Sequence, residues 1–438
     1  MDDKQRSQRD RLIIFSRYPV PGQTKTRLIP ALGRVGAADL QRELTEKALK
    51  TARRFGSGKD VELEVRFEGV SEHKMRRWLG SAALFSNQGP GDLGERMRVA
   101  FLEAFQKGCR RVVLLGTDIP GISTNLLEKA FDGLIDKDLV VGPSRDGGYY
   151  LLGLKGPAKI FQNVPWGTGE VLEKTLALAK DQGLSVLHLD PLIDIDTEED
   201  LKQSLPGWNG PGPYVSVIIP ALNEAENIET TIRHAQDAEA EVIVVDGGST
   251  DRTVETATRT GVHVLTSTRG RAWQQNCGAS AAQGKVLLFL HADTRLPRDY
   301  ISQAFDTLMD PRIALGAFRF KTDLNRFYMK VTELFTNARS RYLKLPYGDQ
   351  ALFLKKSLFQ AIGGFPEVSI AEDLLLVRRL AKQGRIGIAP AEVITSARRW
   401  RTMGMLRTFL TNQVIVIGLV LGVSSHVLAS LYRHSKKK

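Results

Sequence analysis

The stretch that decides the fold runs from Glu241 to Asp251 and reads Glu-Val-Ile-Val-Val-Asp-Gly-Gly-Ser-Thr-Asp. Its β-branched run predicts a strand that is buried on both faces, as in a parallel sheet. The strand ends at Asp246, and the two glycines that follow allow the backbone to turn tightly. The residues from Ser249 onward are types that cap helices. A carboxylate at the carboxyl end of a parallel strand lies where open α/β sheets bind ligands.

A second stretch, in the front half of the chain, has the same design. Residues Arg111 to Gly121 read Arg-Val-Val-Leu-Leu-Gly-Thr-Asp-Ile-Pro-Gly, so that Asp118 ends a buried strand. Around both stretches, short apolar runs alternate with helical patterns, which indicates βαβ units and mostly parallel sheets. The expected strands are residues 12–15, 61–67, 112–116, 139–142, 149–154 and 185–189 in front, and 215–220, 242–246, 262–265, 286–290, 314–320 and 351–354 behind.

A segment rich in proline and glycine separates the two halves. Residues 205–213 contain three prolines and three glycines, which cannot continue a helix or a central strand. At 438 residues the chain is also too long for one ordinary core. We therefore predict two Rossmann-like α/β domains in tandem, at residues 1–205 and 214–400, joined by a linker at 206–213.

The composition narrows the class of protein. The net charge of +12 favours phosphate-bearing partners such as nucleotides, nucleic acids or anionic lipids. No nucleic-acid-binding motif accompanies this charge, so we expect no nucleic-acid partner. Two cysteines that lie in different halves, without a metal or disulfide motif, are typical of a reducing cytoplasmic compartment. The charged N-terminus lacks the apolar region of a signal peptide.

The C-terminal segment, residues 401–438, differs in kind from the two domains. Residues 409–432 contain no Asp, Glu, Lys or Arg, and as a helix they are long enough to cross a bilayer. Polar residues at both ends of this run weaken the pattern, so a helix in the membrane interface or packed on the protein fits as well. The basic end, Arg433 to Lys438, favours attachment to the cytoplasmic face of the membrane. We expect a hydrophobic or amphipathic helix, and the spanning, peripheral and soluble alternatives stay open.

Four polar elements follow apolar runs of the back half. The first contains Pro220, Asn223 and Glu224, at the end of a strand and the start of a helix. The second runs from Asp246 to Asp251, and its first carboxylate can accept hydrogen bonds from a base or a ribose. Each of these two elements is also compatible with a strand end followed by an ordinary helix cap.

The third and fourth elements carry further acids. His291 and Asp293 follow a buried strand, and this pair suits Mn²⁺ or Mg²⁺ bridging a diphosphate, although Asp293 is also a possible helix cap. Glu372 and Asp373 open a helix, where they either complement the helix dipole or provide a general base.

In this order and spacing the four elements resemble glycosyltransferase family 2, which has the GT-A fold, over residues 215–400. The resemblance implies that Asp246 binds the base and ribose of a UDP- or GDP-type nucleotide sugar. It implies that the donor site also includes Pro220, Asn223, Glu224 and Asp251. It also implies that Asp293 binds the metal and that Asp373 deprotonates the acceptor in an inverting transfer. The front half would then be a second GT-A domain.

The chain departs from the family pattern in two places. In the first, the usual Asp-x-Asp motif is replaced by His291-Ala-Asp293. In the second, Arg399 and Trp400 match the end of a Gln-x-x-Arg-Trp element whose Gln is missing here. The resemblance implies that Arg399 and Trp400 help to hold the diphosphate and the acceptor. These departures favour transfer of a single sugar over synthesis of a polymer. The chain is similar to family members assigned to arsenosugar biosynthesis or to carotenoid-type glycosyl transfer. We expect a small or lipid-like acceptor, and the alternative is a membrane-attached enzyme that acts on a membrane lipid or a carotenoid-type molecule.

The front half has its own charged positions. The loop at residues 19–28 places Lys25 and Arg27 where they can neutralise phosphates, although a solvated basic loop fits the pattern equally. Asp118 ends a buried strand and Asp196 comes just before a helix, so the two can bracket one or two Mg²⁺ ions around a nucleotide. A glycine turn between them carries Asp146.

Together these positions look like the DUF2064 proteins, which are GT-A-like and similar to nucleotidyltransferases, over residues 12–201. The resemblance implies that Lys25 and Arg27 contact phosphates, while Asp118 and Asp196 hold the metal. We therefore expect a front domain that makes a nucleotide sugar from an NTP and a sugar phosphate and supplies it to the back domain. The alternative is a front domain that only binds nucleotides or serves for docking.

Overall fold

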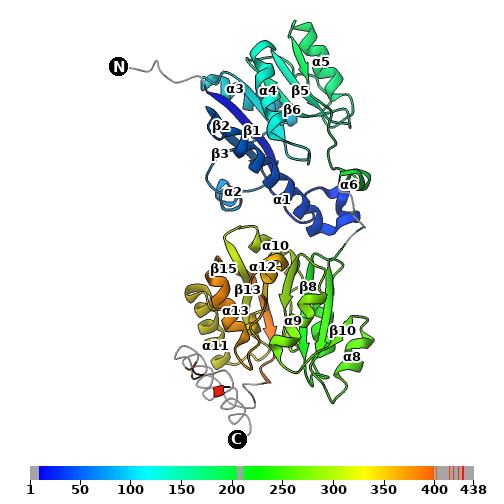
Figure 1. Cartoon of the computed structure of the whole chain (residues 1–438), viewed down its shortest axis with the longest axis vertical. Coiled ribbons are helices and arrows are strands. Elements are labelled where there is room, and N and C mark those ends of the chain that lie inside the picture. Colours follow the sequence, from blue (N-terminus) through cyan, green and yellow to red (C-terminus); the bar gives the residue numbers. More distant parts are fainter. Residues whose placement is uncertain are drawn as a thin grey trace, which may run out of the picture. The chain divides into compact units, whose positions relative to one another are not determined.

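Two β-sheets, one in each half of the chain, contain the apolar runs that the sequence predicts as strands. The computed structural model describes residues 9–204, 210, 212–398, 401, 414, 418, 423, 427 and 428. The chain divides into a front unit, Met1–Pro211, and a back unit, Gly212–Lys438 (Figure 1).

The sheet of the front unit has seven strands within the described residues, in the order β3-β2-β1-β4-β6-β5-β7. Parallel pairing joins β3, β2, β1 and β4, whereas β6 runs antiparallel to both β4 and β5. The sheet is therefore mixed, and the expectation of a mostly parallel sheet holds best for its first four strands. The strands are β1 (Asp10–Arg17), β2 (Val61–Glu68), β3 (Leu84–Asn87), β4 (Val112–Gly116), β5 (Leu139–Pro143), β6 (Tyr149–Leu154) and β7 (Val186–His188).

Helices cover both faces of this sheet because its central strand, β1, carries apolar side chains on both faces. Ile13 and Phe15 of β1 share a buried cluster with residues of α3 and α5. On the opposite face, α1 and α4 pack against each other and against the strands. The helical elements of the front unit are η1 (Thr26–Leu28), α1 (Ile29–Gly56), α2 (Glu72–Leu79), α3 (Leu93–Gln106), α4 (Thr124–Asp136), α5 (Val171–Asp181) and α6 (Glu198–Ser204).

The sheet of the back unit has eight strands within the described residues, in the order β10-β9-β8-β11-β14-β13-β15-β12. The strands from β10 to β11 pair in parallel, whereas β14 runs antiparallel to its neighbours β11 and β13. This sheet, too, is mixed. Its strands are β8 (Val215–Ala221), β9 (Ala240–Asp246), β10 (His263–Thr266), β11 (Val286–Phe289), β12 (Thr294–Arg295), β13 (Ile313–Thr322), β14 (Leu352–Lys355) and β15 (Arg385–Thr395).

Three strands were not among those expected from the sequence. β3 and β12 are short, and β15 has an irregular pattern because Gly387 and Pro390 interrupt its apolar residues. The ladder between β13 and β15 shifts register between Ala317 and Arg319, opposite the segment that contains Pro390. A bulge of this kind lets a proline lie within a paired strand.

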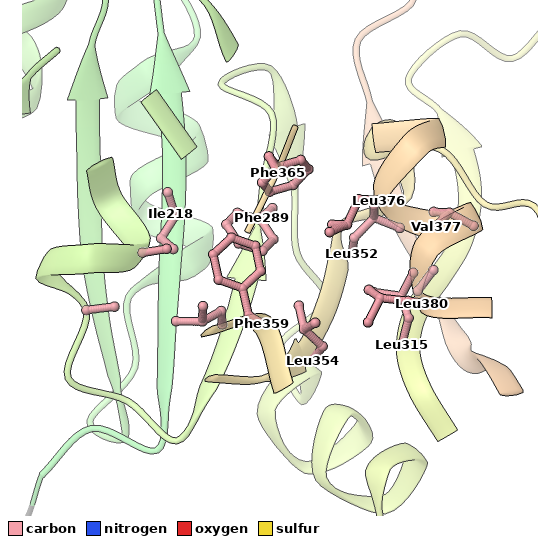
Figure 2. Close-up of a cluster of buried hydrophobic side chains, with 14 of the residues drawn as sticks. Ile218, Phe289, Leu315, Leu352, Leu354, Phe359, Phe365, Leu376, Val377 and Leu380 are labelled. Atoms are coloured by element: carbon pink, nitrogen blue, oxygen red, sulfur yellow. The ribbon is translucent and has the colours of Figure 1, made fainter. Parts of the chain in front are cut away.

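A core of aromatic and aliphatic side chains fills the space between the back sheet and α9, α12 and α13 (Figure 2). The ring of Phe289 lies 4.7 Å from that of Phe365, edge to face, and 5.2 Å from that of Phe359. These distances suit favourable aromatic pairs. The helical elements of the back unit are α7 (Ile228–Ala235), α8 (Thr253–Arg259), α9 (Arg271–Ala281), α10 (Tyr300–Leu308), α11 (Phe327–Ala338), η2 (Arg339–Leu343), η3 (Gly348–Gln350), α12 (Lys356–Ala361) and α13 (Glu372–Ala381).

In each sheet there is a point at which the direction in which successive strands are added reverses. From β8 the chain builds outward to β9 and β10, and it then returns to the other side of β8 as β11. In the front unit the same change occurs between β1 and β4. Ligands of open α/β sheets bind at such points, beyond the carboxyl ends of the strands. We therefore expect the candidate residues of each unit to lie at this point.

The expected C-terminal helix lies almost wholly outside the described residues, as do most residues of the expected linker. None of the helices in the described part of the chain is long and apolar enough to cross a bilayer.

The core predicts the effect of removing its central ring. Phe289→Ala should lower the free energy of unfolding of the back unit by about 3–5 kcal/mol, because Phe289 is 1% exposed and its removal leaves a cavity. Phe327→Ala is the matched control, since Phe327 is 82% exposed, and it should change the same quantity by less than about 0.5 kcal/mol. Urea denaturation of the full chain measures both, and equal losses would contradict this description of the core.

Candidate active sites

Two loops at the carboxyl edge of the back sheet are locked together by side-chain hydrogen bonds. The loop after β8 contains Asn223, whose Oδ1 accepts from the Thr250 backbone N–H at 2.8 Å. In return, the Asn223 N–H donates to Ser249 Oγ at 2.9 Å. Asp251 Oδ2 accepts from the Ala225 N–H at 3.2 Å. Asn223 and Asp251, both predicted to bind the donor, thus also hold the two loops in register.

Asp246 presents a buried oxygen at the end of β9. Its Oδ2 accepts from the backbone N–H groups of Gly248 and Ser249, at 2.8 and 3.0 Å. Its Oδ1 is buried and has no hydrogen-bond partner among the described residues. A buried acceptor without a partner is costly, so this oxygen suits an N–H or O–H donor supplied by a ligand. Pro220, also predicted to line this region, is buried within β8 in register with Val245.

One guanidinium joins the loops that follow β8, β11 and β15. Arg398 Nη2 donates to Glu224 Oε1 at 2.6 Å and lies 3.9 Å from Asp293 Oδ2. Burial raises the pKa of Asp293 and the negative charge of Glu224 raises it further, while the cations Arg398 and Arg271 lower it. The two acids therefore share one positive charge, and Arg398, at 46% exposure, also faces solvent.

The donor set near Asp293 is compatible with a divalent metal that also binds phosphate. Mg²⁺ is usually held by one or two carboxylates together with substrate phosphates, and Asp293 with the neighbouring Glu224 supplies such oxygens. In the described part of the chain, no group of three or more His, Cys, Asp or Glu side chains is arranged to hold a metal by itself. The predicted partner His291 places its Nε2 beside Gly348, close to where a β-carbon on that glycine would lie.

Gly348, the first residue of η3, lies beside both His291 and Asp373. The Gly348 N–H donates to Asp373 Oδ2 at 2.7 Å. A β-carbon at position 348 would lie 2.8 Å from His291 Nε2 and 3.1 Å from Asp373 Oδ2, so a larger residue would push these two side chains apart. Gly348 is a site residue that sequence reasoning missed, because its role depends on the close approach of groups distant in the chain.

Glu372 and Asp373 are adjacent acids in the first turn of α13. Glu372 is 5% exposed, and burial together with the charge of Asp373 raises the pKa of Glu372 to about 7. Arg271, at the start of α9, lies 4.0 Å from Glu372 and opposes this shift. Arg271 lowers the pKa of both Glu372 and Asp293, so it is a second cation of the site that the sequence did not indicate.

In the front unit, Lys25 lies between the two acids predicted to bind metal. Its Nζ is 2.9 Å from Asp118 Oδ1 and 3.5 Å from Asp196 Oδ1, and it donates to the Ile195 carbonyl at 2.7 Å. The Lys25 side chain is only 4% exposed, whereas Arg27 is 77% exposed and lies 3.9 Å from Asp196. Lys25, Asp118 and Asp196 are thus brought together, with an ammonium group shared by the two carboxylates.

A second acidic position lies next to this cluster. Asp146 Oδ1 accepts from Ser144 Oγ and from the Gly148 N–H, which fixes the glycine turn. Burial, and next the charge of Asp146, raises the pKa of Asp194 to about 6. Asp146, Asp194 and Asp196 are therefore electrostatic neighbours at the same edge of the front sheet.

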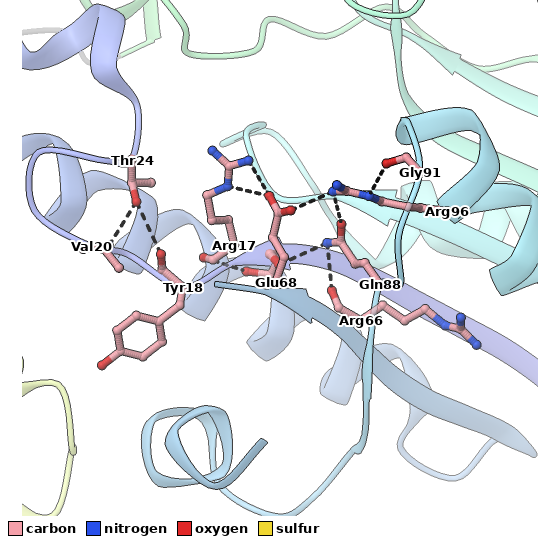
Figure 3. Close-up of polar contacts among 10 residues, drawn as sticks. Arg17, Tyr18, Val20, Thr24, Arg66, Glu68, Gln88, Gly91 and Arg96 are labelled. Carbon is pink, nitrogen blue, oxygen red and sulfur yellow. Dashed lines mark hydrogen bonds and ion pairs between the residues drawn. The ribbon is translucent and has the colours of Figure 1, made fainter. Parts of the chain in front are cut away.

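Sequence reasoning missed a polar network at the ends of β1, β2 and β3 (Figure 3). Glu68 lies between two guanidinium groups, with Oε1 2.5 Å from Arg17 Nε and Oε2 2.6 Å from Arg96 Nη1. Burial opposes ionisation of Glu68, but the two arginines outweigh it and lower its pKa. Gln88 Nε2 completes the network by donating to the carbonyls of Ser16 and Arg66. These residues form no motif, and only their positions at strand ends could have drawn attention to them.

Arg399 and Trp400, predicted to contact the donor, lie outside the described residues. The structure brings the other predicted residues of the back unit together in smaller sets. Asn223 and Asp251 join the loops after β8 and β9, where Asp246 also lies. Glu224 and Asp293 share Arg398, and His291 and Asp373 both lie beside Gly348.

Two family matches agree with this division. Residues 51–168 match DUF2064, described as an uncharacterized protein conserved in bacteria, and residues 216–365 match glycosyl transferase family 2. The predicted fusion of these two domains is therefore confirmed. The second match includes Asp246 and Asp293 and ends before Glu372.

Individual relatives cover parts of the chain. Glycosyltransferase AglE from Haloferax volcanii is 27% identical over 172 residues, which are 35% of this chain and 56% of that protein. The 4,4'-diaponeurosporenoate glycosyltransferase of Staphylococcus haemolyticus is 32% identical over 100 residues, 20% of this chain and 27% of that protein. The chain thus spans about half or less of these curated relatives. A solved structure from Desulfovibrio desulfuricans G20, provisionally named a nucleotide-diphospho-sugar transferase, is 35% identical over 46% of this chain and 88% of its own, with a TM-score of 0.43.

The raised pKa of Glu372 predicts a dependence of stability on pH. A free Glu ionises near pH 4.5, whereas folded Glu372 keeps its proton to about pH 7, so stability is lost as the pH rises between these values. Glu372→Gln should therefore raise the melting temperature more at about pH 8 than at about pH 4. Glu367→Gln, at an exposed position before α13, should shift it equally at both. Equal gains at the two pH values from Glu372→Gln would contradict the raised pKa.

Proposed function

We propose that the back unit is an inverting glycosyltransferase that moves a single sugar from a UDP- or GDP-type nucleotide sugar to an acceptor hydroxyl. The observation that carries this proposal is the buried Oδ1 of Asp246, which has no hydrogen-bond partner in the described part of the chain and lies at the edge of the sheet that also holds Asp293 and Asp373. The match to glycosyl transferase family 2 supports the same class of reaction.

The donor would lie across the ends of β8, β9 and β11. Asp246 Oδ1 would accept a hydrogen bond from the base or the ribose. Arg398 would exchange part of its contact with Glu224 for the diphosphate, because its guanidinium is half-exposed and can form paired hydrogen bonds with phosphate oxygens. Asp293 would hold Mn²⁺ or Mg²⁺, which neutralises charge on the departing diphosphate.

The acceptor would react from the side of Asp373. Asp373 would take the proton from the acceptor hydroxyl while the oxygen forms a bond to the anomeric carbon and the bond to the diphosphate breaks. The Gly348 N–H orients the Asp373 carboxylate through Oδ2. Glu372, whose pKa is raised to about 7, would be partly protonated near neutral pH and would add less negative charge next to the base than an ordinary carboxylate.

The proposed base predicts a separation of catalysis from binding. Asp373→Asn should reduce the turnover number by about 10²- to 10⁴-fold, because an amide cannot take up the proton. Affinity for the nucleotide, measured by titration calorimetry with UDP or GDP and Mn²⁺, should stay within about threefold. The exposed Glu367→Gln is the control and should alter neither quantity. Retention of wild-type turnover by Asp373→Asn would place the base elsewhere.

For the front unit we propose nucleotidyl transfer, in which an NTP and a sugar phosphate give a nucleotide sugar and pyrophosphate. The grouping of Lys25 with Asp118 and Asp196 at the switch point of the front sheet supports a phosphate-handling site. Free carboxylate oxygens of both acids would hold Mg²⁺, and Arg27 would contact phosphates from the solvent side. The second candidate is a non-catalytic nucleotide-binding or docking module. It is favoured because the ammonium group of Lys25 already offsets the negative charge of the two carboxylates that would hold the metal.

Pyrophosphate release by the full chain separates these two candidates. With a matching NTP and sugar phosphate, the catalytic proposal predicts release that the double variant Asp118→Ala, Asp196→Ala abolishes, because the metal loses its protein ligands. Asp132→Ala, at an exposed position on α4, should retain release. If the unmodified chain releases no pyrophosphate with any pair, the front unit is a docking or binding module instead.

The acceptor belongs to the same proposal. Membrane lipids or carotenoid-type molecules are the acceptor classes that we favour. The partial likeness to a glycosyltransferase named for 4,4'-diaponeurosporenoate supports this choice. Residues 401–438 would hold the enzyme at the cytoplasmic face of the membrane, as their apolar centre and basic end suggest.

A further inference from the structure

Helix α11 is attached to the back unit by its polar side. The positions that face inward recur at helical spacing, and they include Met329, Glu333, Asn337 and Ser340. Glu333 Oε1 accepts from the Thr322 N–H and Oγ1 of β13, at 2.8 and 2.7 Å. Apart from the buried Met329, this inner side is polar, which is the reverse of an ordinary surface helix.

Further contacts of the same kind hold the inner side in place. Asn337 pairs with Phe320 through both its Oδ1 and its Nδ2, at 2.8 and 2.9 Å. Ser340 Oγ donates to Gln350 Oε1 at 2.6 Å. These hydrogen bonds fix the orientation of the helix, so its outer face cannot turn inward without breaking them.

The outer side carries large apolar residues. They are Phe327, Leu334, Phe335, Tyr342 and Leu343, and we call this set the α11–η2 face. Its members are 67% to 82% exposed. Exposed apolar side chains grouped on one face of a helix mark a contact with a membrane or another molecule.

The positive charge around the α11–η2 face indicates which kind of partner it binds. Residues 326–344 contain five Lys or Arg and one acid, Glu333, which faces the protein. A second copy would bring the same positive charge against it. The chain's own C-terminal end, residues 433–438, carries four more cations and no acid, so its charge does not complement this face either. An anionic bilayer matches both properties, because it accepts aromatic and aliphatic side chains and attracts Lys and Arg.

A pocket of about 540 Å³ continues this surface toward α13. Its apolar walls include Leu343, Leu345 and Leu375, and the cations Lys344 and Arg378 also line it. Such a combination suits the acyl part and the phosphate of a single lipid.

We propose that the α11–η2 face docks the back unit on an anionic phospholipid bilayer. This contact is independent of the C-terminal segment discussed above. It also has a consequence for the reaction, which rests on the proposed function. Gly348, whose N–H holds Asp373, follows Leu343 by five residues, so docking brings the proposed base near acceptors embedded in the membrane.

Flotation of the full chain with vesicles tests the contact without any sugar donor. We expect binding to phosphatidylcholine vesicles that contain phosphatidylglycerol, and much weaker binding to phosphatidylcholine alone. The double variant Leu334→Ser, Phe335→Ser should lose affinity by about tenfold or more. The matched control is Ile135→Ser, Val254→Ser, two exposed positions on α4 and α8, and it should bind as the unmodified chain does. Lys330→Ala should weaken binding about fivefold, only with the anionic vesicles.

Other results would overturn the proposal. Unchanged flotation of the Leu334→Ser, Phe335→Ser variant would assign membrane binding to another segment. A dimer of the unmodified chain that this variant converts to a monomer would identify a second copy as the partner. A fall in its melting temperature with unchanged flotation would mean that the face is covered by the chain itself. Because these measurements need no catalysis, failure of the glycosyltransferase proposal would leave their outcome unaffected.

Discussion

Strands buried on both faces leave polar groups only one place to gather, at the ends of the strands. All seven residues of β8 are buried, and the last five of β9 are as well. Because β8, β9 and β11 are parallel, their carboxyl ends open at one edge of the sheet. Asn223, Asp246 and Asp293 reach that edge from segments far apart in the chain. The geometry of the candidate site therefore depends on the burial of strands that take no part in the chemistry.

Acids collected at one edge repel each other, and in each unit a cation offsets that repulsion. Arg398 lies by Glu224 and Asp293 in the back unit, and Lys25 lies between its own pair of acids in the front unit. The two cations differ in exposure, at 46% for Arg398 and 4% for Lys25. An exposed guanidinium can exchange a carboxylate for a ligand phosphate, whereas a buried ammonium chiefly holds its loop. Similar charge patterns therefore need not have the same use in the two units.

Much of the architecture could be predicted because strong local patterns coincide with tertiary burial. The β-branched run before Asp246 is a strand, as expected, and the two domains match the two predicted families. Prediction failed at β15, where Pro390 and Gly387 hide a long strand that is stabilised by its neighbour β13. It also failed at Gly348, whose importance comes from two side chains, His291 and Asp373, that occupy the space where a β-carbon would lie.

The sequence by itself determined the order of strands and helices, the carboxylates at strand ends and the family resemblances, because these depend on residues that are close together in the chain. Only the tertiary structure decided which charges are shared, which oxygen of Asp246 has no hydrogen-bond partner among the residues that the structure describes, and which side of α11 faces outward. The helix shows the reason most clearly. Its pattern predicts two faces, but the apolar one would ordinarily be assigned to the core. Hydrogen bonds that β13 donates to Glu333 and Asn337 reverse that assignment, and they exist only once distant segments have packed together.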